Sequence, residues 1–279
     1  TYFMYDHKED FSLNRQYINF KKNLSENISL KVTLDVGRDE NHEFSNDKLH
    51  KKSVDGKLEV FLKKSQLDWS FDGGEKFSAG LIGINAHGVQ ENNWGYRYIE
   101  KSSIDLWGFT KTADLGIGFS KIFFNKLSLS LQVSNGEGYK KPQENRYSRT
   151  WINITYGEKN LSKNSGYNLG VVYSYEPDTL KLDNSNIKLI GLFAGFSNKV
   201  IRIGLDYSMY KNMHKFSLDC INPDGCSEEE LTTWAYRHQQ SISFSSTYIV
   251  TNKLSAFARI DMYDPNLDFE YIGWVGSHM

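Results

Sequence analysis

The residue types that support catalysis are present in this chain, but no spacing brings them together. The seven histidines fall in predicted loops or near the chain ends, and no G-x-S-x-G element occurs. The glycines lie in strands and turns, so no phosphate-binding loop is indicated. His87 and Glu91 are four residues apart, but in a loop that spacing fixes no shared face. The sequence therefore predicts no enzyme, no catalytic residues and no cofactor.

Cys220 and Cys226 bracket the segment CINPDGC in the longest predicted loop. The Pro-Asp-Gly within it is a turn signal, so we expect a disulfide that closes this small loop in an oxidising compartment. Calcium binding by the nearby acids is the sharper alternative. With Gly225 as the EF-hand glycine, however, the first ligand position is Cys220 and the last is Leu231, so that motif fails. The sequence predicts a disulfide and no metal site.

The composition limits the class of protein. The chain has 279 residues, with 33 Lys and Arg against 34 Asp and Glu and a formal charge of −1. This balance argues against nucleic-acid binding. No apolar run approaches the roughly 18 residues of a transmembrane helix. Aromatic residues nevertheless make up 14% of the chain, and the architecture has to accommodate them in a polar protein.

Alternation of apolar and polar residues with period two recurs along the chain and predicts β-strands. In Ile28–Gly37 apolar residues occupy the even positions, and the pattern returns in Ala113–Ser120 and Leu127–Ser134. Thirteen segments qualify in all. The other ten are Phe11–Lys22, Leu58–Phe71, Lys76–Asn85, Thr150–Tyr156, Tyr167–Tyr175, Ile187–Phe196, Ile201–Tyr210, Ser241–Tyr248, Leu254–Met262 and Phe269–Val275.

Short and long connections alternate between these strands. Asn23–Asn27 and Asp72–Glu75 are short, whereas Arg38–Gly56 and Ala86–Thr112 are long. This rhythm is typical of up-and-down outer-membrane barrels, which have tight turns at one end and long loops at the other. Several strands reach the ~9–11 residues needed to cross a bilayer, and aromatic residues gather near strand ends, as in interfacial girdles. A soluble carbohydrate-binding β-sandwich is the alternative, because a sandwich also alternates.

We therefore predict an all-β fold, a transmembrane antiparallel up-and-down β-barrel in the bacterial outer membrane, with residues 1–279 as a single domain. Bacterial barrels normally have even strand numbers. Fourteen strands are favoured, with Thr1–Tyr5 as the end of an extra strand, and twelve come next. The odd count also leads us to expect that the numbered chain lacks part of the natural protein.

Phe11–Gly37 (FSLNRQYINFKKNLSENISLKVTLDVG), Gln66–Trp69 (QLDW) and Asn135–Lys140 (NGEGYK) resemble segments of Gram-negative porins of the phosphate-selective porin-like type. The resemblance implies a bacterial outer-membrane channel for small solutes and identifies no particular solute. Outer-membrane lipid and lipopolysaccharide are then the expected surroundings. Porins often trimerise, so a homotrimer is a further expectation, although no residue in this chain establishes it.

If the apolar face of each strand meets lipid, the alternating charged residues line the lumen and set its selectivity. Acids and bases are nearly balanced among them, so no strong ion preference follows. The alternative is a lumen that these charges plug by pairing with one another. The predicted pore-lining residues are Arg15, Lys31, Asp35, Asp68, Asp114, Arg202, Asp206, Arg259 and Asp261.

The connection Ala86–Thr112 is too long and too aromatic for an idle surface loop. One interpretation is a loop that folds into the barrel and narrows it; the other is a packed extracellular cap. The predicted function is a porin that passes small hydrophilic solutes or ions by passive diffusion. The rival is a non-conducting barrel whose long loops bind a partner or ligand. The predicted constriction residues are Trp94, Arg97, Glu100, Lys101 and Asp105.

Overall fold

The computed structural model describes residues 2–5, 11–37, 40–45, 48–53, 58–143, 146–177, 186–217, 232–251 and 253–267. Side chains are described over 16–37, 58–143, 146–177, 186–212, 237–251 and 253–267. None of the helices in these residues is both long enough and apolar enough to span a membrane.

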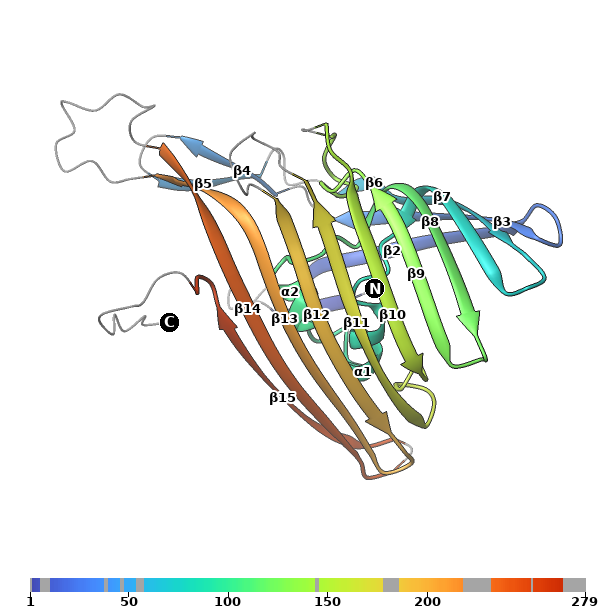
Figure 1. Ribbon diagram of the computed structural model, residues 1–279. Helices are drawn as coiled ribbons and strands as arrows, with labels where there is room; N and C mark the ends of the chain where they lie inside the picture. The colour runs from blue at the N-terminus through green and yellow to red at the C-terminus, as the bar shows by residue number, and fades with distance from the viewer. Residues whose placement is uncertain are drawn as a thin grey trace, which may run out of the picture.

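Thirteen strands form one antiparallel sheet, in which strands that follow one another in the chain are paired (Figure 1). A separate hairpin of β4 (Glu40–Ser45) and β5 (Lys48–Ser53) interrupts the sequence order after the third strand. The thirteen are β1 (Tyr2–Tyr5), β2 (Phe11–Asn23), β3 (Ile28–Gly37), β6 (Glu59–Ser70), β7 (Glu75–Gly83), β8 (Ala113–Phe123), β9 (Leu127–Ser134), β10 (Arg149–Gly157), β11 (Gly166–Glu176), β12 (Ile187–Ser197), β13 (Ile201–Ser217), β14 (Thr232–Ile249) and β15 (Ser255–Asp264).

The predicted all-β, antiparallel up-and-down architecture is confirmed. Twelve of the strands correspond to segments predicted from alternation, and β1 confirms the suggestion that Thr1–Tyr5 holds part of a strand. The predicted strand Phe269–Val275 lies outside the described residues. The sheet of the described residues therefore has thirteen strands where fourteen were favoured, and β1 and β15 form its two edges. The sandwich alternative is wrong, because the second sheet is only the β4–β5 hairpin.

The two ends of the sheet differ in the connections that join the strands there. Segments 24–27, 71–74, 124–126, 158–165, 198–200 and 250–254 join strands at one end, which we call the turn end. Segments 38–58, 84–112, 135–148, 177–186 and 218–231 join them at the other, the loop end. Tight backbone geometry explains the short connections: Phe124 and Asn125 both have positive φ (51° and 56°), as two-residue hairpin turns with right-handed strand twist require.

Exposure alternates along the strands, as the sequence predicted. In β9, Leu131 is 40% exposed and its neighbour Gln132 only 5%. The exposed apolar side chains lie on the convex face. The concave face curves around α1 (Gly88–Trp94) and α2 (Ser103–Leu106), both from the connection between β7 and β8 (Figure 1).

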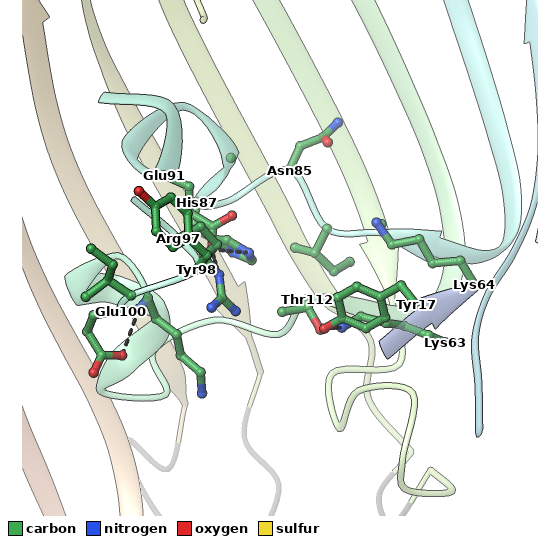
Figure 2. Close-up of a pocket in the computed structure, with 15 residues that line it drawn as sticks. Tyr17, Lys63, Lys64, Asn85, His87, Glu91, Arg97, Tyr98, Glu100 and Thr112 are labelled. Atoms are coloured by element: carbon green, nitrogen blue, oxygen red, sulfur yellow. Dashed lines mark hydrogen bonds and ion pairs between the residues drawn. The ribbon is translucent and has the colours of Figure 1, made fainter. Parts of the chain in front are cut away.

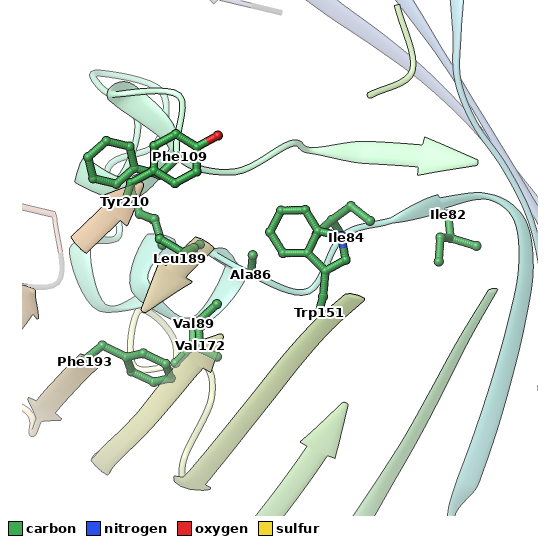
Figure 3. Packing of buried hydrophobic residues seen from close by; sticks show 11 residues of the cluster. Ile82, Ile84, Ala86, Val89, Phe109, Trp151, Val172, Leu189, Phe193 and Tyr210 are labelled. Atoms are coloured by element: carbon green, nitrogen blue, oxygen red, sulfur yellow. The ribbon is translucent and has the colours of Figure 1, made fainter. Parts of the chain in front are cut away.

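The hydrophobic core lies on the concave side of the sheet, between the inserted connection and one wall (Figure 3). The inner face is therefore not uniformly polar, because the inward positions of β10–β13 mix apolar with polar residues. Alternation alone did not indicate this packed wall. Those inward apolar residues are Trp151, Val172, Leu189, Phe193 and Tyr210, and they pack against Ile84, Ala86, Val89, Ile104 and Phe109 of the connection.

Candidate functional site

The chain leaves β7 and turns inward where three amide side chains hold its backbone. Gln132 accepts a hydrogen bond from the backbone N–H of Asn85 at 2.7 Å and donates to the carbonyl of Gly83 at 2.8 Å. Gln66 accepts from the N–H of Gly83 at 3.0 Å. Asn153 donates to the carbonyl of Asn85 at 2.7 Å. Because these bonds satisfy backbone groups inside the sheet, they fix where the connection enters.

Arg149 holds the returning end of the connection, and its side chain is almost fully buried, with 1% of the residue exposed. Its guanidinium donates to the carbonyl of Phe109 at 3.4 Å and to the hydroxyl of Ser174 at 2.8 Å. It also lies over the ring of Trp151, 4.3 Å from the centroid, a favourable cation–π position. Sequence reasoning missed Arg149, because alternation reads it as one more polar residue at a strand end.

Two predicted lumenal arginines hold the middle of the connection through Trp94. Arg202 of β13 donates to the carbonyl of Trp94 at 3.0 Å. The guanidinium of Arg259 lies 5.1 Å from the centre of the Trp94 ring. The indole N–H in turn donates to the carbonyl of Glu100 at 2.9 Å. These contacts attach α1 and the segment after it to the wall formed by β13–β15.

Arg97 braces the connection internally. Its Nε lies 2.6 Å from Oε1 of Glu91 on α1, and a terminal nitrogen donates to Oδ2 of Asp105 on α2 at 3.2 Å. The two short helices are thus tied together by one guanidinium.

His87 stands at the start of α1, beside the same carboxylates. Its Nδ1 is 2.8 Å from the hydroxyl of Thr110, and its Nε2 is 4.0 Å from Oε1 of Glu91. Ligand-type atoms of His87, Glu91 and Asp105 all lie within 4.8 Å of one another, the one such group of three among the described residues. Sequence analysis treated His87 and Glu91 as loop residues, whereas the structure puts them on one helical turn.

The structure places Ala86–Thr112 inside the curve of the sheet, which agrees with the interpretation of a loop that folds inward and not with that of an extracellular cap. All five predicted constriction residues lie in this segment. Trp94, Arg97 and Asp105 make the contacts described above, and Arg97, Glu100 and Lys101 border a cavity of about 520 Å³ (Figure 2).

The predicted lumenal residues with described side chains lie on the concave face, and several of them pair there. Asp35 accepts a hydrogen bond from the Tyr139 hydroxyl at 2.8 Å and lies 3.7 Å from the Lys63 ammonium. Arg259 and Asp261 form a two-point ion pair, with one nitrogen–oxygen distance of 2.6 Å. Asp114 accepts from the backbone N–H of Gly136 and so serves the local turn. The side chain of Arg15 and both cysteines, Cys220 and Cys226, lie outside the described side chains.

Three adjoining cavities follow the wall opposite the apolar core. The first, about 520 Å³, lies between β6 and the inserted connection and contains Lys63 and Lys64 (Figure 2). The second, about 220 Å³, shares Lys64 and Asn85 with the first and is lined by β3 and β6–β9. The third, about 490 Å³, shares Lys76 and Asn85 with the second and reaches the turn end at Gly74 and Lys159.

The lining of these cavities is basic. Three acidic residues, Glu91, Glu100 and Asp68, border the cavities. Burial lowers the pKa of Lys159, which lies in the turn after β10. Among the residues that line these cavities, basic residues therefore outnumber acidic ones. The basic residues are eight: Lys31, Lys63, Lys64, Lys76, Arg97, Lys101, Lys121 and Lys159.

The fold and this site define a class: antiparallel up-and-down β proteins with a connection inserted into the concave side. No family model and no curated protein matches the chain. Among solved structures it is similar to a loop L8 deletion mutant of OmpT, an outer membrane protein of Vibrio cholerae, with 9% identity over 92% of this chain and 88% of that chain and a TM-score of 0.42. Similarity to the trimer form of in-vitro folded OmpT has 9% identity, covers 92% and 84% of the two chains, and has a TM-score of 0.41.

Proposed function

We propose that this protein is a bacterial outer-membrane channel through which small hydrophilic solutes diffuse without covalent chemistry. The convex face supports the membrane location. Leu169, Leu205 and Ile260 are each at least half exposed there, and a coat of this kind is stable against lipid but not against water. Strands β10–β15 have from 9 to 18 residues, enough for tilted strands to cross a bilayer, which takes ~9–11.

The single observation that carries the channel proposal is the off-centre polar route. The inserted connection packs by its apolar residues against β10–β13 and leaves the opposite wall lined by lysine, glutamine and serine side chains. Neighbouring cavities share lining residues, and this supports a polar path that runs along them toward the turn end. Small solutes pass beside the connection and not through the centre of the sheet's curve.

The excess of basic residues supports a preference for anions. Charged side chains along a pore bias which ions enter it, and here eight basic residues face three acidic ones. A small anion would encounter Lys63 and Lys64 in the first cavity, then Lys76 nearer the turn end.

Planar-bilayer recording of the detergent-solubilised chain tests the proposal. We expect discrete conductance steps and, in a salt gradient, a reversal potential of the sign produced by anions. Insertion into the bilayer without any conductance would refute the channel and favour a binding role for the loops.

A non-conducting barrel is the second candidate. The observation that favours it is the pairing of several inner charges, including Lys63 with Asp35 and Arg97 with Glu91. The homotrimer stays a separate proposal, tested by mass measurement of the detergent complex in light scattering.

A further inference from the structure

One side of the His87 ring is fixed by a hydroxyl. His87 is buried, with 7% of the residue exposed, and its Nδ1 contacts the hydroxyl of Thr110 at 2.8 Å. In the tautomer with its proton on Nδ1, the ring donates to this hydroxyl and Nε2 has a free lone pair. That is the form in which an imidazole binds metal ions.

This lone pair faces two carboxylates. Nε2 is 4.0 Å from Oε1 of Glu91, too far for a hydrogen bond. Oε1 of Glu91 is itself buried without a hydrogen-bond partner, although it is ion-paired with Arg97. With Asp105, the three ligand-type atoms lie within 4.8 Å of one another. Small side-chain rotations would bring each to about 2.0–2.2 Å from a common point, the bond length of zinc to nitrogen and oxygen.

In the structure, the guanidinium of Arg97 supplies the positive charge beside Glu91 and Asp105. Arg97 contacts both carboxylates, but its side chain is 31% exposed and borders the 520 Å³ cavity. It can therefore turn into the cavity without losing solvation. A divalent ion would then replace the single positive charge of Arg97 by two.

We propose that His87, Glu91 and Asp105 bind a divalent transition-metal ion of the zinc type in exchange for the guanidinium of Arg97. One imidazole and two carboxylates form a donor set that suits zinc and leaves a fourth position for water. Thr110 contacts Nδ1 and so orients the imidazole. Metal-binding histidines commonly have such a hydrogen-bond partner at the ring nitrogen that does not bind the metal. Ion binding would take over the bracing of α1 and α2 and release Arg97 toward the cavity.

Zinc titration of the full chain in detergent, after treatment with a chelator, tests this site and does not depend on conductance. By calorimetry we expect one zinc ion per chain, lost in both His87→Ala and Asp105→Asn. Arg97→Gln should bind zinc more tightly, since the competing cation is gone. Thr110→Val should weaken binding about 10–100-fold, whereas Thr110→Ser should retain it. His238→Ala, which alters a histidine on β14, is the matched control and should bind as the unaltered chain does.

Cobalt supplies a second readout through its ligand-field spectrum, which should report one nitrogen ligand and should be lost in both His87→Ala and Asp105→Asn. The proposal is overturned if zinc affinity is the same in His87→Ala, or if Arg97→Gln does not bind more tightly. It is also overturned if zinc binds Arg97→Gln but not the unaltered chain.

Discussion

Arg202 donates a hydrogen bond to the backbone carbonyl of Trp94 at 3.0 Å, which joins the start of β13 to the last residue of α1. The approach is close because the next residue is Gly95, at φ 80°, where an added Cβ would lie 2.3 Å from the Arg202 guanidinium. One buried arginine and one glycine thus help to fix the position of the inserted connection.

Replacing this arginine should loosen the connection. Arg202→Met keeps much of the side-chain volume but removes the charge-assisted hydrogen bond, so we expect a loss of about 1.5–3 kcal/mol of unfolding free energy. Urea unfolding in detergent, followed by tryptophan fluorescence, measures it. Lys199→Met, in an exposed turn, is the control. Equal stability of the Arg202 variant and the unaltered chain would show that the bond does not hold α1.

The basic wall should set ion preference. Lys64→Gln and Lys76→Gln each remove a charge that borders two cavities. We expect the reversal potential in a salt gradient to move toward cation preference in each variant, and further in the double variant. Lys199→Gln, outside the cavities, should leave it unchanged. A reversal potential that ignores both substitutions would contradict the assigned route.

Deleting Asn92–Gly108 should widen the channel. The segment fills the concave side next to the first cavity, so its removal should raise single-channel conductance, while the exposed core residues lower stability. Deletion of Asn41–Lys52, within the separate β4–β5 hairpin, is the control. Unchanged conductance after the first deletion would mean that the segment does not narrow the route.

Lys159 should make the anion preference sensitive to pH. Burial lowers its pKa below the ordinary lysine value, so it loses its charge at a lower pH than an exposed lysine does. Anion preference should therefore decline as pH rises into the alkaline range. Lys159→Met should show a weaker preference at neutral pH and a flatter dependence above it. Reversal potentials recorded from neutral to alkaline pH decide this, and identical curves for the two proteins would rule Lys159 out.

Phe109 should be a main stabilising contact of the inserted connection. It is completely buried, and its ring stacks on Tyr210 with centroids 5.0 Å apart. Phe109→Ala should cost about 3–5 kcal/mol of unfolding free energy. Leu169→Ala, on the convex face, should cost far less in detergent. A small loss for Phe109→Ala would show that the connection is not held by its apolar contacts.

The strands could be predicted from the sequence because each half-buried strand repeats with period two. Leu127–Ser134 shows this directly, since its apolar residues lie on the convex face of β9. The helix Gly88–Trp94 could not be predicted, because seven residues are too few for a recognisable period and its stability comes from the wall it packs on. For the same reason the proximity of His87 to Glu91 was missed. The sequence around Trp151 and Val172 does not show whether the inner face of their strands contacts a packed segment or water.

In the proposed channel, the off-centre position of the inserted connection assigns folding and solute passage to different residues. Substitutions at inward positions of β10–β13 should change stability and leave solute passage unchanged. Substitutions along β3 and β6–β9 should change solute passage with little effect on stability. A protein divided in this way can acquire a new solute preference by altering one wall only. The other wall, β10–β13, would keep the inserted connection in place while such changes accumulate.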